Sequence, residues 1–175
     1  MTPLVQNLNY LLAIGTLGIQ VLSLYLMYLY VTKKTVAETE IAKQALCITF
    51  VVSLGGLVMT LLYSDVFDFI PCGLCWFERI CLYPIVLLSG IAWWKKDTAI
   101  ADYILGLSGI GAVVGLYHHY IQMGGSELIA CPAAGQGADC AKRIIFEFDY
   151  ITFPLMAFSL FVFIGILMLI LRRKL

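Results

Sequence analysis

Long apolar runs separated by short polar stretches dominate this chain of 175 residues. A helix that rises about 1.5 Å per residue needs roughly 20 mostly apolar residues to cross the hydrocarbon core of a bilayer. Five runs are long enough: Leu8–Val31, Ala45–Tyr63, Cys75–Trp94, Ile100–Tyr120 and Ile151–Leu171. Because backbone polar groups in hydrocarbon must be satisfied within the segment, these runs predict five transmembrane helices.

The first run, Leu8–Val31, resembles a retained membrane span more than a cleaved signal peptide. Its apolar stretch is long, no basic segment precedes it, and no small-residue cleavage pattern follows. We therefore expect two parts in the chain. Residues 1–44 form an additional N-terminal transmembrane helix with a cytoplasmic linker, and residues 45–175 form a core of four transmembrane helices.

The composition supports a membrane protein and excludes a nucleic-acid-binding one. Hydrophobic residues make up 62% of the chain and charged residues 13%, and the mean hydropathy is +0.95. A soluble domain is about half apolar and about a quarter charged. The sequence also lacks the basic patch that nucleic-acid binding needs. The expected fold class is thus an all-α membrane protein, a four-helix bundle with one extra N-terminal helix.

The basic residues predict how the spans cross the membrane, because Lys and Arg gather on the cytoplasmic side. Eight of the eleven basic residues follow the first, third and fifth spans: Lys33, Lys34, Lys43, Lys95, Lys96, Arg172, Arg173 and Lys174. We therefore expect the N-terminus outside and the C-terminus inside the cell. The linkers 64–74 and 121–150 then both lie outside the cytoplasm.

The predicted topology divides the six cysteines into two groups. Cys72, Cys75, Cys131 and Cys140 belong to the two outer linkers or their borders, where an oxidising compartment lets disulfides persist. The other two lie within spans, and a buried free cysteine usually behaves as a small hydrophobic residue. Cys47 and Cys81 are therefore expected to be core residues.

The stretch "PCGLCWFER" places a Cys-x-x-Cys pair at the start of a predicted helix. The helix dipole and its free N–H groups stabilise a thiolate there, which favours a redox pair over half of a zinc site. Arg79 follows Cys75 by four residues and so shares its helix face. An ionisable residue within a span indicates a functional site, although Arg79 could instead reach the interface or pair with Glu78 or Asp68.

The second pair stands in "CPAAGQGADC", a loop of small residues. A disulfide between Cys131 and Cys140 could be purely structural, but an exposed disulfide in a mobile loop also suits thiol exchange. After Cys140, apolar residues alternate with four charges, which favours a short interfacial helix over a ragged start of the last span. His118 and His119 end the fourth span, and either could approach Cys75 and Arg79.

The pattern Cys-x-Leu-Cys-x-x-Glu-Arg, followed by a second outer pair ending in "DCAKR", resembles the DsbB family of disulfide bond formation proteins. The resemblance covers about Ala45 to Leu171 and implies a thiol:quinone oxidoreductase of the bacterial cytoplasmic (inner) membrane. Its expected cofactor is ubiquinone or menaquinone from the respiratory quinone pool. Its expected partner is a DsbA-like thioredoxin-fold oxidase, which the protein would reoxidise.

The resemblance also implies a role for each site residue. The partner's thiolate would attack Cys131, Cys140 would exchange with Cys72, and Cys75 would be released towards the quinone. Arg79 would hold the quinone and the Cys75 thiolate, with His118 or His119 beside it. The first span and its linker are additional to the four spans usual in this family, and they would serve as an anchor or as a docking helix for a partner.

Three alternatives remain at this point. A vitamin K epoxide reductase-like enzyme would also use two cysteine pairs and a quinone, but Arg79 at this spacing favours the DsbB family. A structural zinc site is disfavoured by the eight-residue gap between Cys131 and Cys140 and by the nearby Arg79 cation. A non-enzymatic membrane scaffold with two structural disulfides is the third.

Overall fold

Five long helices form most of the computed structural model, which describes residues 3–32, 35–127, 131 and 139–173. They are α1 (Pro3–Thr32), α2 (Thr35–Leu61), α3 (Gly73–Lys95), α4 (Ala101–Gln122) and α5 (Phe153–Arg173). Each helix is long and apolar enough to cross a membrane. The five predicted spans and the all-α membrane fold are confirmed.

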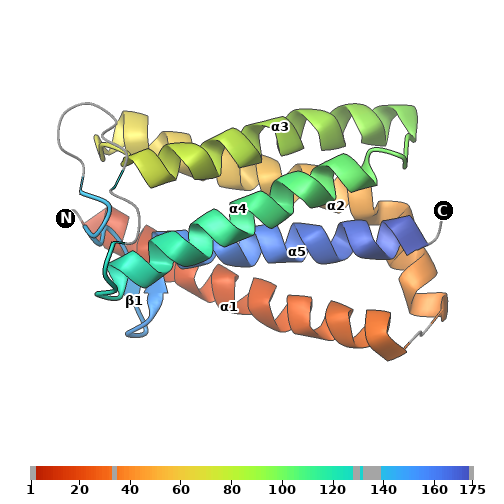
Figure 1. Cartoon of the computed structure of the whole chain (residues 1–175), viewed down its shortest axis with the longest axis horizontal. Helices are drawn as coiled ribbons and strands as arrows, with labels where there is room; N and C mark the ends of the chain where they lie inside the picture. The colour runs from red at the N-terminus through yellow and green to blue at the C-terminus, as the bar shows by residue number, and fades with distance from the viewer. Residues whose placement is uncertain (1–2, 33–34, 128–130, 132–138, 174–175) are drawn as a thin grey trace.

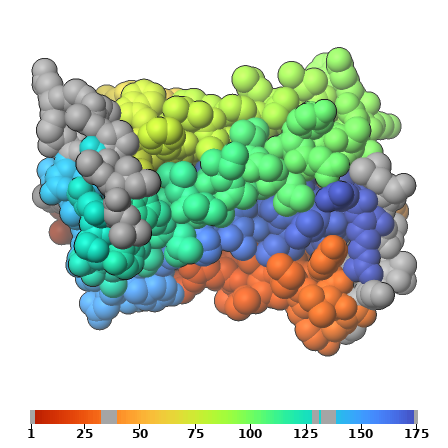
Figure 2. Space-filling view, viewed as in Figure 1, coloured from red at the N-terminus to blue at the C-terminus, as the bar shows by residue number. Residues whose placement is uncertain are grey.

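The last helix, α5, lies at the centre of the bundle. It packs against α1, α2 and α4, while α3 packs against α2 and α4 (Figure 1). Its most deeply buried side chains include Phe161, Ile164 and Leu167. In the space-filling view α3, α4, α5 and α1 follow one another across a single face (Figure 2). The outward side chains of these helices are largely apolar, as a lipid environment requires.

Two glycines of α4 allow it to approach α5 closely. A Cβ atom on Gly111 would lie 2.6 Å from the ring of Phe161, and one on Gly115 would lie 3.2 Å from the backbone nitrogen of Phe158. Small residues at membrane helix contacts let backbones come together and maximise van der Waals packing. The Gly111-x-x-x-Gly115 spacing in the sequence therefore marks a true helix–helix contact.

The N-terminal helix α1 is joined to α5 by polar contacts. Gln20 Nε2 donates a hydrogen bond to Ser159 Oγ at 3.0 Å. Near the other end of α5, Arg173 Nη1 donates to the carbonyl oxygen of Tyr30 at 2.7 Å. These contacts lie along the interface between α1 and α5.

The chain changes conformation where α2 ends. A π-helical turn, η1 (Leu62–Val66), continues α2, and Asp68 then adopts a left-handed backbone with φ of 55°. Single π-helical turns are rare and occur often at functional sites. The turn η1, the start of α3 and the end of α4 lie at the same end of the bundle as the start of α1 (Figure 1).

The segment after Cys140 forms a small hairpin, so the predicted interfacial helix is wrong. Strand β1 (Phe146–Glu147) pairs antiparallel with β2 (Ile151–Thr152). Phe148 and Asp149 at the turn have φ of 52° and 61°, and this left-handed pair closes a tight hairpin and cannot continue a right-handed helix.

Candidate functional site

Cys72 caps the N-terminus of α3. Its backbone is extended, with φ of −74° and ψ of 171°, and its Sγ accepts a hydrogen bond from the backbone nitrogen of Cys75 at 3.4 Å. The first N–H groups of a helix have no partner within the helix and stabilise an anion placed there. The sequence prediction of a Cys-x-x-Cys pair at a helix start is confirmed.

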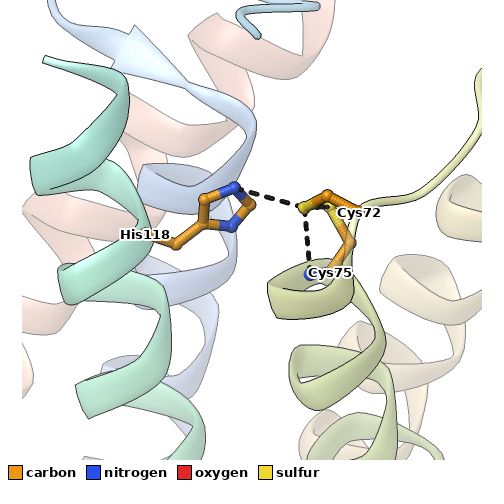
Figure 3. Close-up of side chains that lie close together, drawn as sticks. All are labelled: Cys72, Cys75 and His118. Atoms are coloured by element: carbon orange, nitrogen blue, oxygen red, sulfur yellow. Dashed lines mark hydrogen bonds between the residues drawn. The ribbon is translucent and has the colours of Figure 1, made fainter. Parts of the chain in front are cut away.

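The two thiols of this pair meet a histidine from a neighbouring helix. Cys72 Sγ lies 2.9 Å from Cys75 Sγ and 3.6 Å from Nε2 of His118, which lies on α4 (Figure 3). Figure 3 shows the imidazole of His118 pointing across the gap between α4 and α3. A basic nitrogen is thereby within hydrogen-bonding distance of Cys72.

Glu78 orients this histidine from the other side of its ring. His118 Nδ1 lies 2.9 Å from Glu78 Oε1, and both side chains are buried. When Nδ1–H donates to the carboxylate, Nε2 faces Cys72 as an acceptor. Cys72, His118 and Glu78 therefore form a hydrogen-bonded chain that can take a proton from the Cys72 thiol.

The neighbours of Cys72 favour its thiolate. The hydrogen bond from the Cys75 thiol lowers the pKa of Cys72, and the hydrogen bond and positive charge of His118 lower it further. Burial acts in the opposite direction but is outweighed. A thiol of low pKa is a good leaving group in thiol–disulfide exchange, so Cys72 is suited to be displaced from a mixed disulfide.

The second cysteine pair forms a disulfide, Cys131–Cys140. Cys140 is fully buried and shares a cluster with Cys72, while Cys131 is half-buried and packs against that cluster. Cys75 packs against it as well. Tertiary packing thus brings together all four cysteines that the sequence assigned to the outer linkers, whereas Cys81 lies in the separate membrane core.

A cavity of about 260 Å³ opens beside the Cys72–Cys75 pair. Its walls are mostly apolar and include Phe69, Leu82, Phe153, Leu160 and Phe161. Such a site suits a flat, lipid-soluble ring, because a dry apolar cavity of about 150 Å³ already accepts benzene.

Polar residues line the same cavity near the thiols. Arg79 lies there with Cys72, Cys75, Glu78 and His118. Its Nη2 donates to the carbonyl oxygen of Thr60 at 2.7 Å, and its guanidinium lies 5.3 Å from the centre of the Trp76 ring. These contacts hold a cation, buried to all but 8% of its surface, at the wall of an apolar cavity.

The structure separates the two histidines that the sequence could not distinguish. His118 lines the cavity, whereas His119 Nδ1 lies 2.8 Å from Thr152 Oγ1 in β2 and is outside the cavity lining. Neighbouring helix residues point about 100° apart, so only one of the two can face α3.

Two further cavity residues were missed as functional residues by the sequence reasoning. Glu78 has a sequence signal, since a carboxylate within a membrane span is costly and indicates function. Gln122 has none. Its Oε1 is buried without a hydrogen-bond partner in the described part of the chain, although its Nε2 donates to the Lys142 carbonyl oxygen. Gln122 lines the cavity, and a buried polar atom without a hydrogen-bond partner is uncommon in a folded protein.

The same geometry offers metal-type ligands. Ligand atoms of Cys72, Cys75 and His118 lie within 4.8 Å of one another. Structural zinc takes four protein ligands, and within the described residues this group has three. The zinc site considered from the sequence also required Cys131 and Cys140, which are joined to each other instead.

Comparison with known proteins identifies similar chains. A family model described as "Disulfide bond formation protein DsbB" matches residues 42–171. The SPbeta prophage-derived disulfide bond formation protein B of Bacillus subtilis (strain 168) is 36% identical over 141 residues, which cover 79% of this chain and 94% of that protein. Disulfide bond formation protein C of the same organism is 36% identical over 128 residues, covering 72% and 91%. The probable disulfide formation protein C 1 of Bacillus anthracis is 39% identical over 118 residues, covering 67% and 81%. No solved structure matches the chain.

Proposed function

Because this chain belongs to the DsbB family of disulfide bond formation proteins, we propose that it is a membrane thiol:quinone oxidoreductase. It reoxidises a DsbA-like thioredoxin-fold dithiol protein and delivers the electrons to ubiquinone or menaquinone. The observation that carries the proposal is the packing of both cysteine pairs in one cluster beside an apolar cavity.

The first exchange takes place at the second pair. A partner thiolate attacks Cys131 Sγ, the Cys131–Cys140 bond breaks, and Cys140 leaves as a thiolate. The partner's second thiolate then displaces Cys131, so the partner gains a disulfide and this chain gains a dithiol. The unequal burial of the pair supports this order, because Cys140 is fully buried and Cys131 is the more accessible sulfur.

The second exchange passes the electrons to the first pair. The Cys140 thiolate attacks Cys72 in a Cys72–Cys75 disulfide and Cys75 leaves as a thiolate. Cys131 then displaces Cys72, which restores the Cys131–Cys140 disulfide. The shared cluster of Cys72 and Cys140 supports a transfer that needs only a short displacement.

Re-formation of the Cys72–Cys75 disulfide releases two electrons and two protons. His118 accepts the proton of Cys72, and Glu78 holds the imidazole in the orientation that makes this possible. Arg79 stabilises negative charge on Cys75 and on a ligand oxygen in the cavity. A quinone held in this cavity would supply the acceptor for the two electrons and two protons, with a quinol as the product.

The orientation proposed for this reaction has the cysteine-bearing end outside the cytoplasm. The Lys and Arg distribution supports it, since the C-terminal ends of α3 and α5 lie at the opposite end of the bundle (Figure 1) and carry Lys95, Lys96, Arg172 and Arg173. Partner thiols then reach Cys131 from an oxidising compartment, and quinone reaches the cavity from the membrane.

Reconstitution tests the proposal. The purified protein in lipid is mixed with a reduced thioredoxin-fold oxidase and a short-chain quinone, and quinone absorbance is followed. We expect catalytic quinone reduction by the wild type and its loss in Cys72→Ser, Cys75→Ser, Cys131→Ser and Cys140→Ser. Cys47→Ser and Cys81→Ser, matched changes of cysteines outside the cluster, should remain active.

The same preparation distinguishes the alternatives. Stoichiometric zinc that is lost in Cys72→Ser would favour the three-ligand metal site instead. A protein that neither exchanges disulfides with the partner nor reduces quinone would be a scaffold. Normal turnover by Cys75→Ser would refute the electron path described above.

A further inference from the structure

The N-terminal helix α1 lies outside the family match, which begins at residue 42, yet it contacts the cavity wall. Asn9 of α1 is buried to all but 3% of its surface, and its Oδ1 accepts a hydrogen bond from the hydroxyl of Tyr63. Tyr63 lies in η1 and lines the cavity. One hydrogen bond thus connects the additional helix to the redox site.

Tyr63 is the centre of an aromatic cluster. Its ring centroid lies 5.9 Å from that of Phe69, 5.3 Å from that of Phe153 and 5.5 Å from that of Phe67. Phe69 and Phe153 line the cavity as well. A displacement of Tyr63 would therefore move a large part of the aromatic wall, because tightly packed rings shift together.

The Asn9–Tyr63 hydrogen bond reaches this wall, whereas three other polar side chains of α1 make contacts elsewhere. The hydroxyls of Thr16 and Ser23 donate to carbonyl oxygens of α1 itself, and Gln20 bonds to Ser159 of α5, which is outside the cavity lining. A buried polar group that loses its hydrogen-bond partner destabilises the arrangement that buries it. Replacing Asn9 would leave the Tyr63 hydroxyl without its hydrogen-bond partner. A different position of the Tyr63 ring would then be favoured.

The end of α2, just before η1, also connects to Arg79. Thr60, one helical turn before Ser64, provides the carbonyl oxygen that holds the Arg79 guanidinium, and its hydroxyl lies 3.4 Å from the Tyr83 hydroxyl. Fixing η1 at Tyr63 therefore restrains the end of α2 that positions the cavity's cation.

We propose that Asn9 is a positioning residue for the electron-acceptor cavity, and that α1 is an intramolecular brace which holds Tyr63 and so sets the affinity for the quinone. The inference rests on the proposed function. In the proposed division of the chain, residues 1–44 would then complete the acceptor site of the four-helix core formed by residues 45–175.

The test compares Asn9→Leu, Tyr63→Phe and the double variant by steady-state quinone reduction. We expect the KM for a short-chain quinone to rise about fivefold in each single variant, within the range known for residues that act through others, with a smaller change in kcat. The double variant should show the same rise rather than the product of the two, because both changes remove one hydrogen bond.

Gln20→Leu is the matched control, since it removes one hydrogen bond between α1 and α5 without affecting a cavity residue. Its quinone KM should equal that of the wild type. A second measurement is the single-turnover reduction of the Cys131–Cys140 disulfide by partner without quinone, which should proceed at the wild-type rate in all these variants.

The outcomes separate the two proposals. An unchanged KM in Asn9→Leu and Tyr63→Phe, or an equal rise in Gln20→Leu, overturns the role of Asn9 and leaves the proposed function intact. A wild type that exchanges disulfides but does not reduce quinone overturns both. If Asn9→Leu does not fold, Tyr63→Phe decides alone, because it removes only an oxygen atom.

Discussion

His118 on α4 lies with its Nε2 3.6 Å from Cys72 Sγ at the start of α3, although 46 residues separate the two along the chain. Its Nδ1 is occupied by Glu78. This arrangement places a proton acceptor beside the sulfur that is attacked by Cys140 and then re-forms the disulfide with Cys75.

Replacing His118 should make the Cys72 thiolate harder to form. In His118→Gln the pKa of Cys72 should rise towards the ordinary thiol value of about 8.5, because one hydrogen bond and one positive charge that lower it are removed. Quinone reduction at neutral pH should fall about 100-fold. Thiolate absorbance of the reduced protein, titrated with acid, measures the pKa, and the rate is followed on the same samples.

The lowered pKa of Cys72 also predicts how stability depends on pH. Between that pKa and about 8.5 the unfolded chain binds a proton that the folded chain does not, so the stability of the reduced protein rises with pH in this window. The contribution of Cys72 to the free energy of unfolding is complete above about pH 8.5. It is lost as the pH falls through the lowered pKa of Cys72. His118→Gln should narrow the pH range over which stability rises. His119→Gln should leave that pH range unchanged, because the His119 imidazole contacts Thr152 instead.

Glu78→Gln should impair the enzyme while keeping the shape of the site. A glutamine amide N–H pointing at His118 Nδ1 favours the tautomer with its proton on Nε2, which can no longer accept from Cys72. We expect a rate loss of about 100-fold. Glu78→Asp keeps a carboxylate and should recover part of the rate. Equal losses in the two variants would argue against an orienting carboxylate.

A partner that lacks its second thiol should become trapped on Cys131. The attack stops at the mixed disulfide because nothing displaces Cys131, and the fully buried Cys140 is shielded from a protein nucleophile. Peptide mapping by mass spectrometry identifies the linked cysteine. Cys131→Ser should give no covalent complex, and a partner found on Cys140 would reverse the proposed order of exchange.

Glycines of α4 should differ sharply in their tolerance of a methyl group. Gly115→Ala should destabilise the bundle by about 1–3 kcal/mol, since the new Cβ would press on the backbone of α5 at Phe158. Gly106→Ala meets nothing within 4 Å and should be neutral or slightly stabilising, because alanine is the better helix former. Thermal unfolding in detergent compares the two, and equal effects would mean that α4 and α5 do not pack as described.

The successes and failures of the sequence reasoning have distinct causes. The five spans followed from apolar length, and the redox pair followed from the spacing of Cys72 and Cys75 at a helix start. The prediction of an interfacial helix after Cys140 was wrong because the charge pattern of that segment is compatible with both a helix and a hairpin. The left-handed turn at Phe148 and Asp149, packed near Tyr10 of α1 at a ring distance of 5.7 Å, selects the hairpin.

By itself, the sequence determined the membrane environment, the number of spans and the candidate chemistry, because hydrocarbon burial and helix-start electrostatics act on neighbouring residues. Tertiary structure alone decided which histidine meets Cys72, that Cys140 packs with the first pair, and that Asn9 bonds to Tyr63 across 54 positions. Those contacts depend on how the helices rotate and pack against one another. That rotation is set by the close approach of side chains from neighbouring helices, and most of these side chains lie far apart in the sequence.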